Sequence, residues 1–511
     1  MDSHQIAVIS LISLILFILP AFGAYLLFPK AGKPGWKALV PVLNSYEMLR
    51  IADRPLIWFF LQFIPVVGWF ITLGLLIEFI KTFGRFKFWE HTLIVLTLGL
   101  YLIVIGMDPK TRFIGREGVL KYKKSTAREW IDAAVFAVVA ATLIRTFVFE
   151  AYTIPTGSME KTLLINDFLF VSKFSYGPRI PNTPLSIPFV HNTMPVTDGN
   201  SYVEWIKIPY TRWWPSPVKR NDVVVFNFPE GDTVINLPEY QSLRPYYEVC
   251  RELGRGSMDS GRQIVLNNPD QYPLVLRPVD KEENYIKRCT AIAGDTLQIK
   301  NQVLWINGKA VPFPAESETN YTVTLAKNVQ LDEQAVKDQY DVDINKPEEF
   351  QPTGIANQYD ILLTWAAHEK MVKSGLAVSI TPDIDSQEMV WPYTPGLTWT
   401  RDNFGPVWVP AKGATLTLTP QNYPVYQRVI RVYEHNQFEL KDGKFWLNGQ
   451  PVTQYTFKMN YYWMMGDNRH GSQDSRYWGF VPEDHVVGEA ALIWMSWDHG
   501  VRWSRLFKKI K

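Results

Sequence analysis

Two short segments of the sequence carry residue types that could cleave an acyl bond through a serine nucleophile. Ser158 follows Gly157, and a serine in such a tight turn can present its hydroxyl while backbone N–H groups point the same way. Lys287 lies in the apolar run 285–293, which we expect to form a strand. Burial lowers the pKa of a lysine amine from about 10.4 to as little as about 5–6, and the neutral amine could then take the proton of a serine hydroxyl.

A third segment, residues 464–482, begins as an apolar strand and continues as a dense polar stretch. We interpret it as a charge-paired platform beside the other two, braced either by Asp474 with Arg476 or by Asp467 with Arg476. Each of the three segments taken alone has an ordinary alternative. A Gly-Ser turn is common, a strand lysine can point to water, and a polar loop can serve solubility alone.

Together, and in this order, the segments resemble the type I signal peptidases, which are membrane-bound endopeptidases with a Ser-Lys pair. The residues PTGSMEKTL resemble the nucleophile motif of that family, and YIKRCTAIAGD resembles its lysine motif. The stretch MGDNRHGSQDSRYWGFVP resembles the closing motif, and KRNDVVVF (residues 219–226) is similar to a strand motif. The sequence departs from the family at Lys161, where proline is usual, at Asn221 in place of glycine, and at His470-Gly471.

The resemblance implies catalytic roles for three residues. Ser158 would be the nucleophile and Lys287 the general base, and neither a metal ion nor another cofactor would be needed. The hydroxyl of Thr156 and the backbone N–H of Ser158 would stabilise the oxyanion. The residues that orient the lysine amine or form a structural charge network would be Ser472, Asp467, Asp474 and Arg476.

The resemblance also implies a substrate and a place of action. The residues that line shallow pockets for small substrate side chains at positions −1 and −3 would be Ile154, Met159, Leu163 and Ile286. Such a protein would remove N-terminal signal peptides from exported preproteins at the outer face of the cytoplasmic (inner) membrane of a bacterium. Its expected partners are therefore the signal peptides of preproteins and the lipid bilayer.

Composition argues against several other classes. The net charge of +2, from 52 basic and 50 acidic residues, gives no argument for a nucleic-acid partner, and 8 His with 2 Cys argue against a His- or Cys-based metal site. Three alternatives remain: a Ser-His-Asp hydrolase that uses His470 or His485, a self-cleaving Ser-Lys repressor protease, and a membrane-anchored binding module without activity. Cys250 and Cys289 could pair or remain free thiols.

The first 150 residues are far more apolar than the rest and predict a membrane region. The candidate transmembrane segments are residues 6–28, 56–80, 92–107 and 131–149. The first has no basic flank, so we interpret it as an uncleaved span and not as a signal peptide. Up to three spans would then lie within residues 1–107, and the last within 130–150.

The charge of the loops predicts the orientation of these segments. Seven basic residues place the loop 108–129 in the cytoplasm, so the chain after Glu150 lies outside and the protein is multi-pass. The basic loop 29–55 agrees with this orientation. The loop 81–91 would then lie outside despite its three basic residues.

From Ala151 onward, short β-rich runs alternate with Pro, Gly and Asn turns, which predicts a mainly antiparallel β domain. We assign residues 151–311 and 429–511 to this catalytic domain, and 312–428 to an inserted β-rich subdomain. One weak helix is expected near residues 332–340. The segments 297–311 and 438–452 share a pattern that predicts a hairpin in each.

The last segment, residues 502–511, places Trp503, Leu506, Phe507 and Ile510 at helical spacing. We expect a short amphipathic helix there. Its apolar face would lie either in the interface of an anionic membrane or against the β domain.

Overall fold

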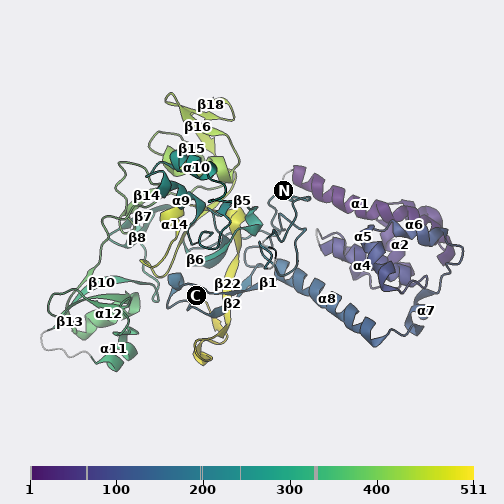
Figure 1. Ribbon diagram of the computed structural model, residues 1–511, viewed down its shortest axis with the longest axis horizontal. Helices are drawn as coiled ribbons and strands as arrows, with labels where there is room; N and C mark the ends of the chain where they lie inside the picture. The colour runs from purple at the N-terminus through teal and green to yellow at the C-terminus, as the bar shows by residue number, and fades with distance from the viewer. Residues whose placement is uncertain are drawn as a thin grey trace. The chain divides into compact units, whose positions relative to one another are not determined.

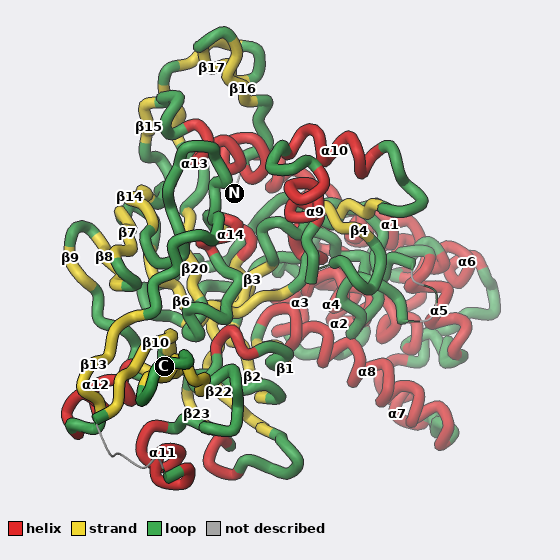
Figure 2. Tube along the Cα trace, turned by 60° about the vertical axis from the view of Figure 1, so that its left-hand side comes forward, coloured by secondary structure: helices red, strands yellow, loops and turns green. Residues whose placement is uncertain are grey.

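The computed structural model describes residues 3–64, 67–195, 197, 199–241, 243–326 and 332–510. The chain divides into two compact units. The first comprises Met1–Phe147 with Pro178–Trp213, and the second comprises Val148–Gly177 with Trp214–Lys511. The first unit is largely helical and the second is rich in strands, as the colours of Figure 2 show.

Two helices of the first unit are long and apolar enough to cross a membrane. They are Ser10–Leu27, within α1, and the whole of α8, and the described residues contain no third helix of this kind. The α-helices described in this unit are α1 (Ser3–Leu27), α2 (Leu43–Ile51), α3 (Ile57–Leu61), α4 (Val67–Lys81), α5 (Phe88–Leu96), α6 (Tyr101–Met107), α7 (Gly115–Lys121) and α8 (Thr126–Phe147).

The second and third predicted spans are each divided into two short helices, so the expectation of four spans is corrected to two candidates. The longest of these pieces, α4, has 15 residues, whereas a helix needs about 20 to cross a bilayer. Leu98 and Gly99 follow α5 with φ angles of 49° and 95°, and such left-handed residues end a helix. Residues 65 and 66, between α3 and α4, lie outside the described residues.

Close contact between α1 and α6 depends on two glycines. A Cβ atom added at Gly23 would lie 2.2 Å from the Cβ of Leu102, and one added at Gly106 would lie 2.6 Å from the Cβ of Leu26. Small residues at such crossings let helix backbones approach in an apolar environment. In contrast, only 6% of the apolar span of α8 is buried by the rest of the chain.

The second unit is built on an eight-stranded sheet (Figure 1). Its strands, in order across the sheet, are β1 (Phe149–Thr153), β2 (Asp167–Ser172), β22 (Val486–Ser496), β3 (Val223–Asn227), β6 (Asn284–Ala291), β20 (Tyr461–Met465) and β21 (Val481–Pro482), with β23 (Lys508–Lys509) beside β22. Neighbouring strands run antiparallel, which confirms the predicted strand direction. Every residue of β3 and β20 is buried, so both faces of these central strands are covered.

Both predicted hairpins are present. The turn of the first has φ angles of 46° and 68° at Asn301 and Gln302, and the turn of the second has 51° and 72° at Asp442 and Gly443. Two successive left-handed residues are typical of the tight turns that match the twist of paired strands. The first hairpin pairs β7 (Thr296–Lys300) with β8 (Val303–Ile306), and β9 (Lys309–Ala310) then pairs with β8. The second pairs β16 (Phe438–Lys441) with β17 (Lys444–Leu447), and β18 (Gln450–Val452) then pairs with β17.

Part of the region 312–428 forms a separate small sheet, which we call the β10–β13 module (Figure 1). It comprises β10 (Glu318–Leu325), α11 (Glu333–Tyr340), β11 (Phe350–Pro352), β12 (Gln358–Thr364), α12 (Trp365–Ser374) and β13 (Ala377–Pro382). Val323, Leu363 and Met371 are buried in its own apolar core. The later strand β14 (Phe404–Trp408) pairs instead with β7, and its Phe404 is buried in the main core with Trp463. Helix α11 confirms the weak helix expected near residues 332–340.

Further short elements of the second unit were not expected. The helices are α9 (Tyr246–Leu253), α10 (Met258–Leu266), α13 (Tyr423–Arg428) and α14 (Ser475–Trp478), and the strands are β4 (Thr233–Ile235), β5 (Leu274–Leu276) and β19 (Gln454–Thr456). The strand β15 (Thr415–Thr417), which pairs with β19, lies in one of the β-rich runs of the sequence. These helices are too short for the 3.6-residue period to be distinct from the surrounding loops. The side-chain oxygen of Ser257, which caps α10 by accepting from the N–H of Ser260, was a signal that could have revealed that helix.

The expectation of a C-terminal helix is wrong. Residues Trp503–Arg505 form one 3₁₀ turn, and β23 then pairs with β22. The segment folds this way because Arg505 turns inward, where its Nε donates to the fully buried carboxylate of Asp167 at 3.0 Å. Lys511 lies outside the described residues.

The two cysteines are both free and buried. Cys250 lies in α9 and Cys289 in β6, and each packs in a different apolar cluster. The alternative of a disulfide is therefore excluded by their positions.

Candidate active site

The side chains of Ser158 and Lys287 meet in the second unit. Lys287 Nζ lies 2.7 Å from Ser158 Oγ, and the two residues are 4% and 9% exposed, respectively. Ser158 lies in the 3₁₀ turn Gly157–Met159 after β1, and Lys287 lies in β6. The structure thus brings together two residues that are 129 positions apart in the chain.

Burial changes the acidity of the lysine amine. Loss of hydration is the largest effect and lowers the pKa of Lys287 from 10.5 to about 8. The carboxylates of Asp474 and Asp467 oppose this shift, and the guanidinium of Arg476 adds to it. A substantial fraction of the amine is therefore neutral slightly above neutral pH, in contact with the hydroxyl that it would deprotonate.

The polar segment after β20 forms two buried ion pairs near this lysine. Asp474 accepts from Arg476 Nε at 2.9 Å and from its terminal nitrogen at 2.8 Å, which is the first of the two pairings considered from the sequence. Asp467 pairs instead with Arg288, at 2.8 and 2.6 Å, and accepts from the Thr162 hydroxyl at 2.6 Å. Bidentate pairs of this kind fix the geometry of both partners.

Arg288 and Thr162 are the supporting residues that sequence reasoning missed. Arg288 follows Lys287 directly in the lysine motif. A buried strand arginine requires a carboxylate partner, and that requirement is the signal that could have identified Arg288.

Ser472 is buried close to the backbone of the nucleophile. A Cβ atom added at Gly466 would lie 2.1 Å from Ser472 Oγ and 2.5 Å from the carbonyl oxygen of Ser158, so only glycine fits between them. The Ser472 hydroxyl donates to the carbonyl of Gln473 at 3.3 Å. Among the hydrogen bonds of the described residues there is none from Ser472 to the Lys287 amine, so the implied orienting contact remains an expectation.

Thr156 immediately precedes the nucleophile turn. Its backbone is extended, with φ of −134°, and its side chain is exposed beside the buried Ser158. On the other side of the turn, the N–H of Asn468 donates to the carbonyl of Ser158 at 3.2 Å. These contacts fix the backbone of the turn from which an oxyanion would be bound.

The four predicted pocket residues share one apolar cluster. Ile154, Met159 and Leu163 are 3%, 0% and 0% exposed, and the partly buried Ile286 packs against them. The side chains therefore lie together, but three of them form closed core. Access for a substrate side chain would be along Ile286, beside Lys287 on β6.

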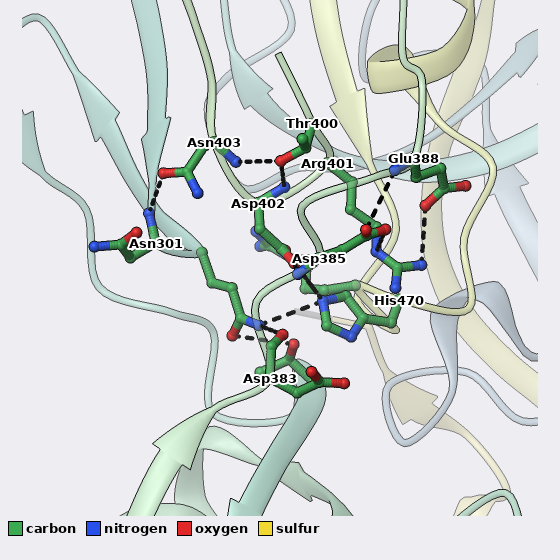
Figure 3. Close-up of polar contacts among 12 residues, drawn as sticks. Asn301, Asp383, Asp385, Glu388, Thr400, Arg401, Asp402, Asn403 and His470 are labelled. Carbon is green, nitrogen blue, oxygen red and sulfur yellow. Dashed lines mark hydrogen bonds and ion pairs between the residues drawn. The ribbon is translucent and has the colours of Figure 1, made fainter. Parts of the chain in front are cut away.

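The structure places both candidate histidines away from Ser158. Figure 3 shows His470 beside Asp402, with its Nε2 3.0 Å from the nearer carboxylate oxygen. His485 contacts Asp484 at 2.7 Å and Glu282 at 3.3 Å. The only hydrogen bond of the Ser158 hydroxyl among the described residues is with Lys287, so the geometry gives no support to a Ser-His-Asp hydrolase.

A serine hydroxyl bonded to a buried amine on an antiparallel β scaffold is the arrangement of a Ser-Lys hydrolase. Comparison with known protein families identifies which one. The family described as signal peptidase, peptidase S26, matches residues 127–348 and 409–497, which is more than half of the chain. The chain therefore belongs to the signal peptidase family. A family of unknown function matches residues 36–116.

Individual relatives agree with this assignment. Signal peptidase I of Haemophilus influenzae is 25% identical over 395 residues, which cover 76% of this chain and 77% of that protein. Signal peptidase I of Buchnera aphidicola (subspecies Schizaphis graminum) is 24% identical over 371 residues, covering 71% and 76%. Signal peptidase I of Pseudomonas aeruginosa is 21% identical over 366 residues, covering 70% and 68%.

Proposed function

We propose that this chain removes signal peptides from exported preproteins with Ser158 as the nucleophile and Lys287 as the general base. Family membership establishes that it is a serine endopeptidase acting on preproteins. The observation that supports the residue assignment is the 2.7 Å contact between the Ser158 hydroxyl and a buried amine. The lowered pKa of Lys287, about 8, makes that amine a usable base.

The reaction follows from this contact. The neutral Lys287 amine takes the proton of Ser158, whose Oγ attacks the carbonyl carbon of the scissile bond. The hydroxyl of Thr156 and the N–H of Ser158 donate to the oxyanion, and one such donor is typically worth about 3–4 kcal/mol. The protonated Lys287 then gives its proton to the leaving amine. In the second half, the amine takes a proton from water, whose oxygen attacks the acyl carbon. The bond between this carbon and Ser158 Oγ then breaks, and Lys287 returns the proton to Oγ.

The closed apolar cluster beside Ser158 would select substrates with small side chains near the cleavage site. The side chains of Ile154, Met159 and Leu163 leave little free volume, and Ile286 is the member that is partly exposed. A short residue such as alanine at −1 and −3 could be accommodated next to them, whereas a large or charged residue would require the core to open.

We also propose that α1 and α8 anchor the chain in the cytoplasmic membrane of a bacterium. The exposed apolar side chains of α8 would then face lipid. With only these two spans, the basic loops 29–55, 81–91 and 108–129 all lie on the cytoplasmic side, which removes the charge conflict of a four-span topology. The chain after α8 would lie outside, so Ser158 would be close to the membrane surface from which signal peptides emerge.

Cleavage of a labelled preprotein by the purified full chain tests the proposal. Wild type should release the mature protein, and Ser158→Ala should leave the preprotein intact. The matched control is Ser379→Ala, at an exposed position of β13, which should cleave normally. A wild-type protein that binds the preprotein but never cuts it would indicate the binding-module alternative instead.

A further inference from the structure

Lys161 connects the nucleophile turn to the β10–β13 module. Its Nζ donates to the carbonyl oxygen of Asp341 at 2.7 Å and lies 3.2 Å from a carboxylate oxygen of the same residue. A carboxylate oxygen of Glu349 is 3.9 Å away. Asp341 ends helix α11, so the ammonium lies at the helix end where the backbone dipole is negative.

The backbone of Lys161 also has an unusual conformation. Its φ angle is +66°, which is uncommon for a residue other than glycine. Proline, the usual residue of the family here, has φ fixed near −65° and could not adopt this turn. The Lys161 side chain is only 13% exposed, so the turn directs it into the contact with the module and not into solvent.

Contacts next to Lys161 continue into the active site. The hydroxyl of Thr162 donates to Asp467 at 2.6 Å, and Asp467 pairs with Arg288, the neighbour of Lys287. The N–H of Leu163 donates to the carbonyl of Met159 at 2.7 Å, which closes the turn after the nucleophile. A displacement of Lys161 would therefore be transmitted to both members of the Ser-Lys pair.

The module reaches the same site from a second direction. The N–H of Glu318, at the start of β10, donates to the carbonyl of Asp467 at 2.8 Å, and the N–H of Arg469 donates to the carbonyl of Glu318 at 2.9 Å. Between these, the N–H of Asn468 donates to the carbonyl of Ser158. The module thus contacts both the turn that carries the nucleophile and the loop that bonds to the nucleophile's backbone.

We propose that Lys161 is a positioning residue, through which the β10–β13 module sets the distance between Ser158 and Lys287. The inference rests on the proposed Ser-Lys mechanism. Misplacing a catalytic group by about 1 Å can cost on the order of 100-fold in rate, so a link at this turn affects turnover more than substrate binding.

The test compares Lys161→Met with Lys161→Arg in the full-length protein, using a labelled preprotein. The methionine variant keeps the length of the side chain without its charge and should lower kcat by roughly 10- to 100-fold with KM changed less than about threefold. The arginine variant keeps the charge and should retain most of the activity. The matched control is Lys337→Met, which removes an exposed ion pair with Asp343 inside the module and should leave kcat unchanged.

A double-mutant cycle distinguishes loss of this contact from a general loss of folding. The Asp341 side chain is 75% exposed and that of Glu349 is 14% exposed, and asparagine and glutamine keep the shapes of these side chains, so Asp341→Asn with Glu349→Gln should leave the fold intact and reproduce part of the kcat loss. The triple variant, which adds Lys161→Met to these two substitutions, should lose kcat by a factor smaller than the product of two factors. These are the kcat loss of Lys161→Met and the kcat loss of the Asp341→Asn, Glu349→Gln variant.

Two outcomes would overturn the inference. In one, Lys161→Met keeps wild-type kcat. In the other, its kcat loss is matched by Lys337→Met, which would show general damage to the module. Either result is distinguishable from failure of the proposed mechanism, which would appear as cleavage by Ser158→Ala.

Discussion

Lys287 and Arg288 are adjacent on β6, and both are buried, but their partners differ. Arg288 is neutralised by Asp467 in a bidentate pair at 2.8 and 2.6 Å. The Lys287 amine has instead the hydroxyl of Ser158 at 2.7 Å. Because alternate strand residues face opposite sides, the two cations are directed into different environments. Arg288 forms a structural ion pair, and Lys287 loses enough hydration to act as a base.

Activity should rise with pH through the pKa of Lys287. The neutral amine is the active form, so kcat/KM should increase as pH rises toward and past about 8. Lys287→Arg should be inactive because guanidinium stays protonated at all accessible pH values. A pH–rate profile of preprotein cleavage measures both. Arg431→Lys, a matched exchange at an exposed position, should keep the wild-type profile. Cleavage by Lys287→Arg would contradict the assignment.

The size of the apolar cluster beside Ser158 should set substrate selectivity. Ile154→Ala combined with Ile286→Ala opens space, so preproteins with a larger residue at −3 should be accepted roughly 10- to 100-fold better relative to alanine. The ratio of kcat/KM values for two preproteins measures this. Leu304→Ala, in the main core and outside the cluster that contains Ile154, is the control and should leave the ratio unchanged. Unaltered selectivity in the double variant would disprove the pocket assignment.

Among the elements, β10 combines a structural role with a buried carboxyl group whose ionised form is unfavourable. Glu318 begins this strand and bonds through its backbone to the active-site loop. Its carboxyl is 1% exposed, and neither oxygen has a hydrogen-bond partner among the described residues. Burial raises the pKa of Glu318 from 4.5 to about 8, and the positive charge of Lys161 only partly opposes this. The folded strand therefore favours the protonated form of this carboxyl.

Glu318→Gln should stabilise the second unit above pH 4.5. The unfolded carboxyl ionises near that pH, but the folded one stays protonated to about 8, so the native wild type loses stability relative to the unfolded chain between those values. Glutamine has no such loss, and the gain of the variant should grow over this range and then level off. Thermal unfolding across the range measures it, with the exposed Glu439→Gln as the control. A gain that does not depend on pH would contradict the argument.

The C-terminal segment should behave as part of the β domain. Arg505→Met leaves the buried Asp167 carboxylate without its partner, and breaking such a pair typically costs about 3–5 kcal/mol. Deleting residues 502–510 should cost at least as much because β23 is lost from β22. Denaturant unfolding measures the change, and Lys508→Met, at an exposed position, is the control. Unchanged stability with weaker binding to anionic liposomes would favour the membrane-helix alternative.

At the scale of the whole molecule, the two units differ in how they bury apolar surface. The first unit covers α1 with α6 and α4 but leaves α8 largely exposed, and such a helix requires an apolar environment. The second unit has several apolar cores of its own. This difference supports the proposal that helices α1 and α8 of the first unit lie in the membrane and that the second unit carries out catalysis.

The two-span topology makes a prediction that a four-span topology contradicts. Lys87, in the loop 81–91, is exposed and should lie in the cytoplasm. In intact cells, Lys87→Cys should react with a membrane-impermeant maleimide only after permeabilisation. The outside control is Lys444→Cys, at the exposed first residue of β17 in the second unit, and the inside control is Lys110→Cys in the basic loop. The native thiols are buried and should react little. Labelling of Lys87→Cys in intact cells would indicate four spans.

The sequence by itself determined the chemical groups and the local elements that carry them. Residue types and short spacings along the chain were enough to predict Ser158, Lys287, the hairpin turns and the apolar strands, because each of these features depends on neighbouring residues. Only the tertiary structure decided which distant groups pair: Asp467 with Arg288, Lys161 with Asp341, and Arg505 with Asp167. It also converted the predicted C-terminal helix into β23 and divided two predicted spans into short helices. The physical reason is that a buried charge or an open strand edge takes whatever partner the folded chain brings near, and no local pattern specifies that partner.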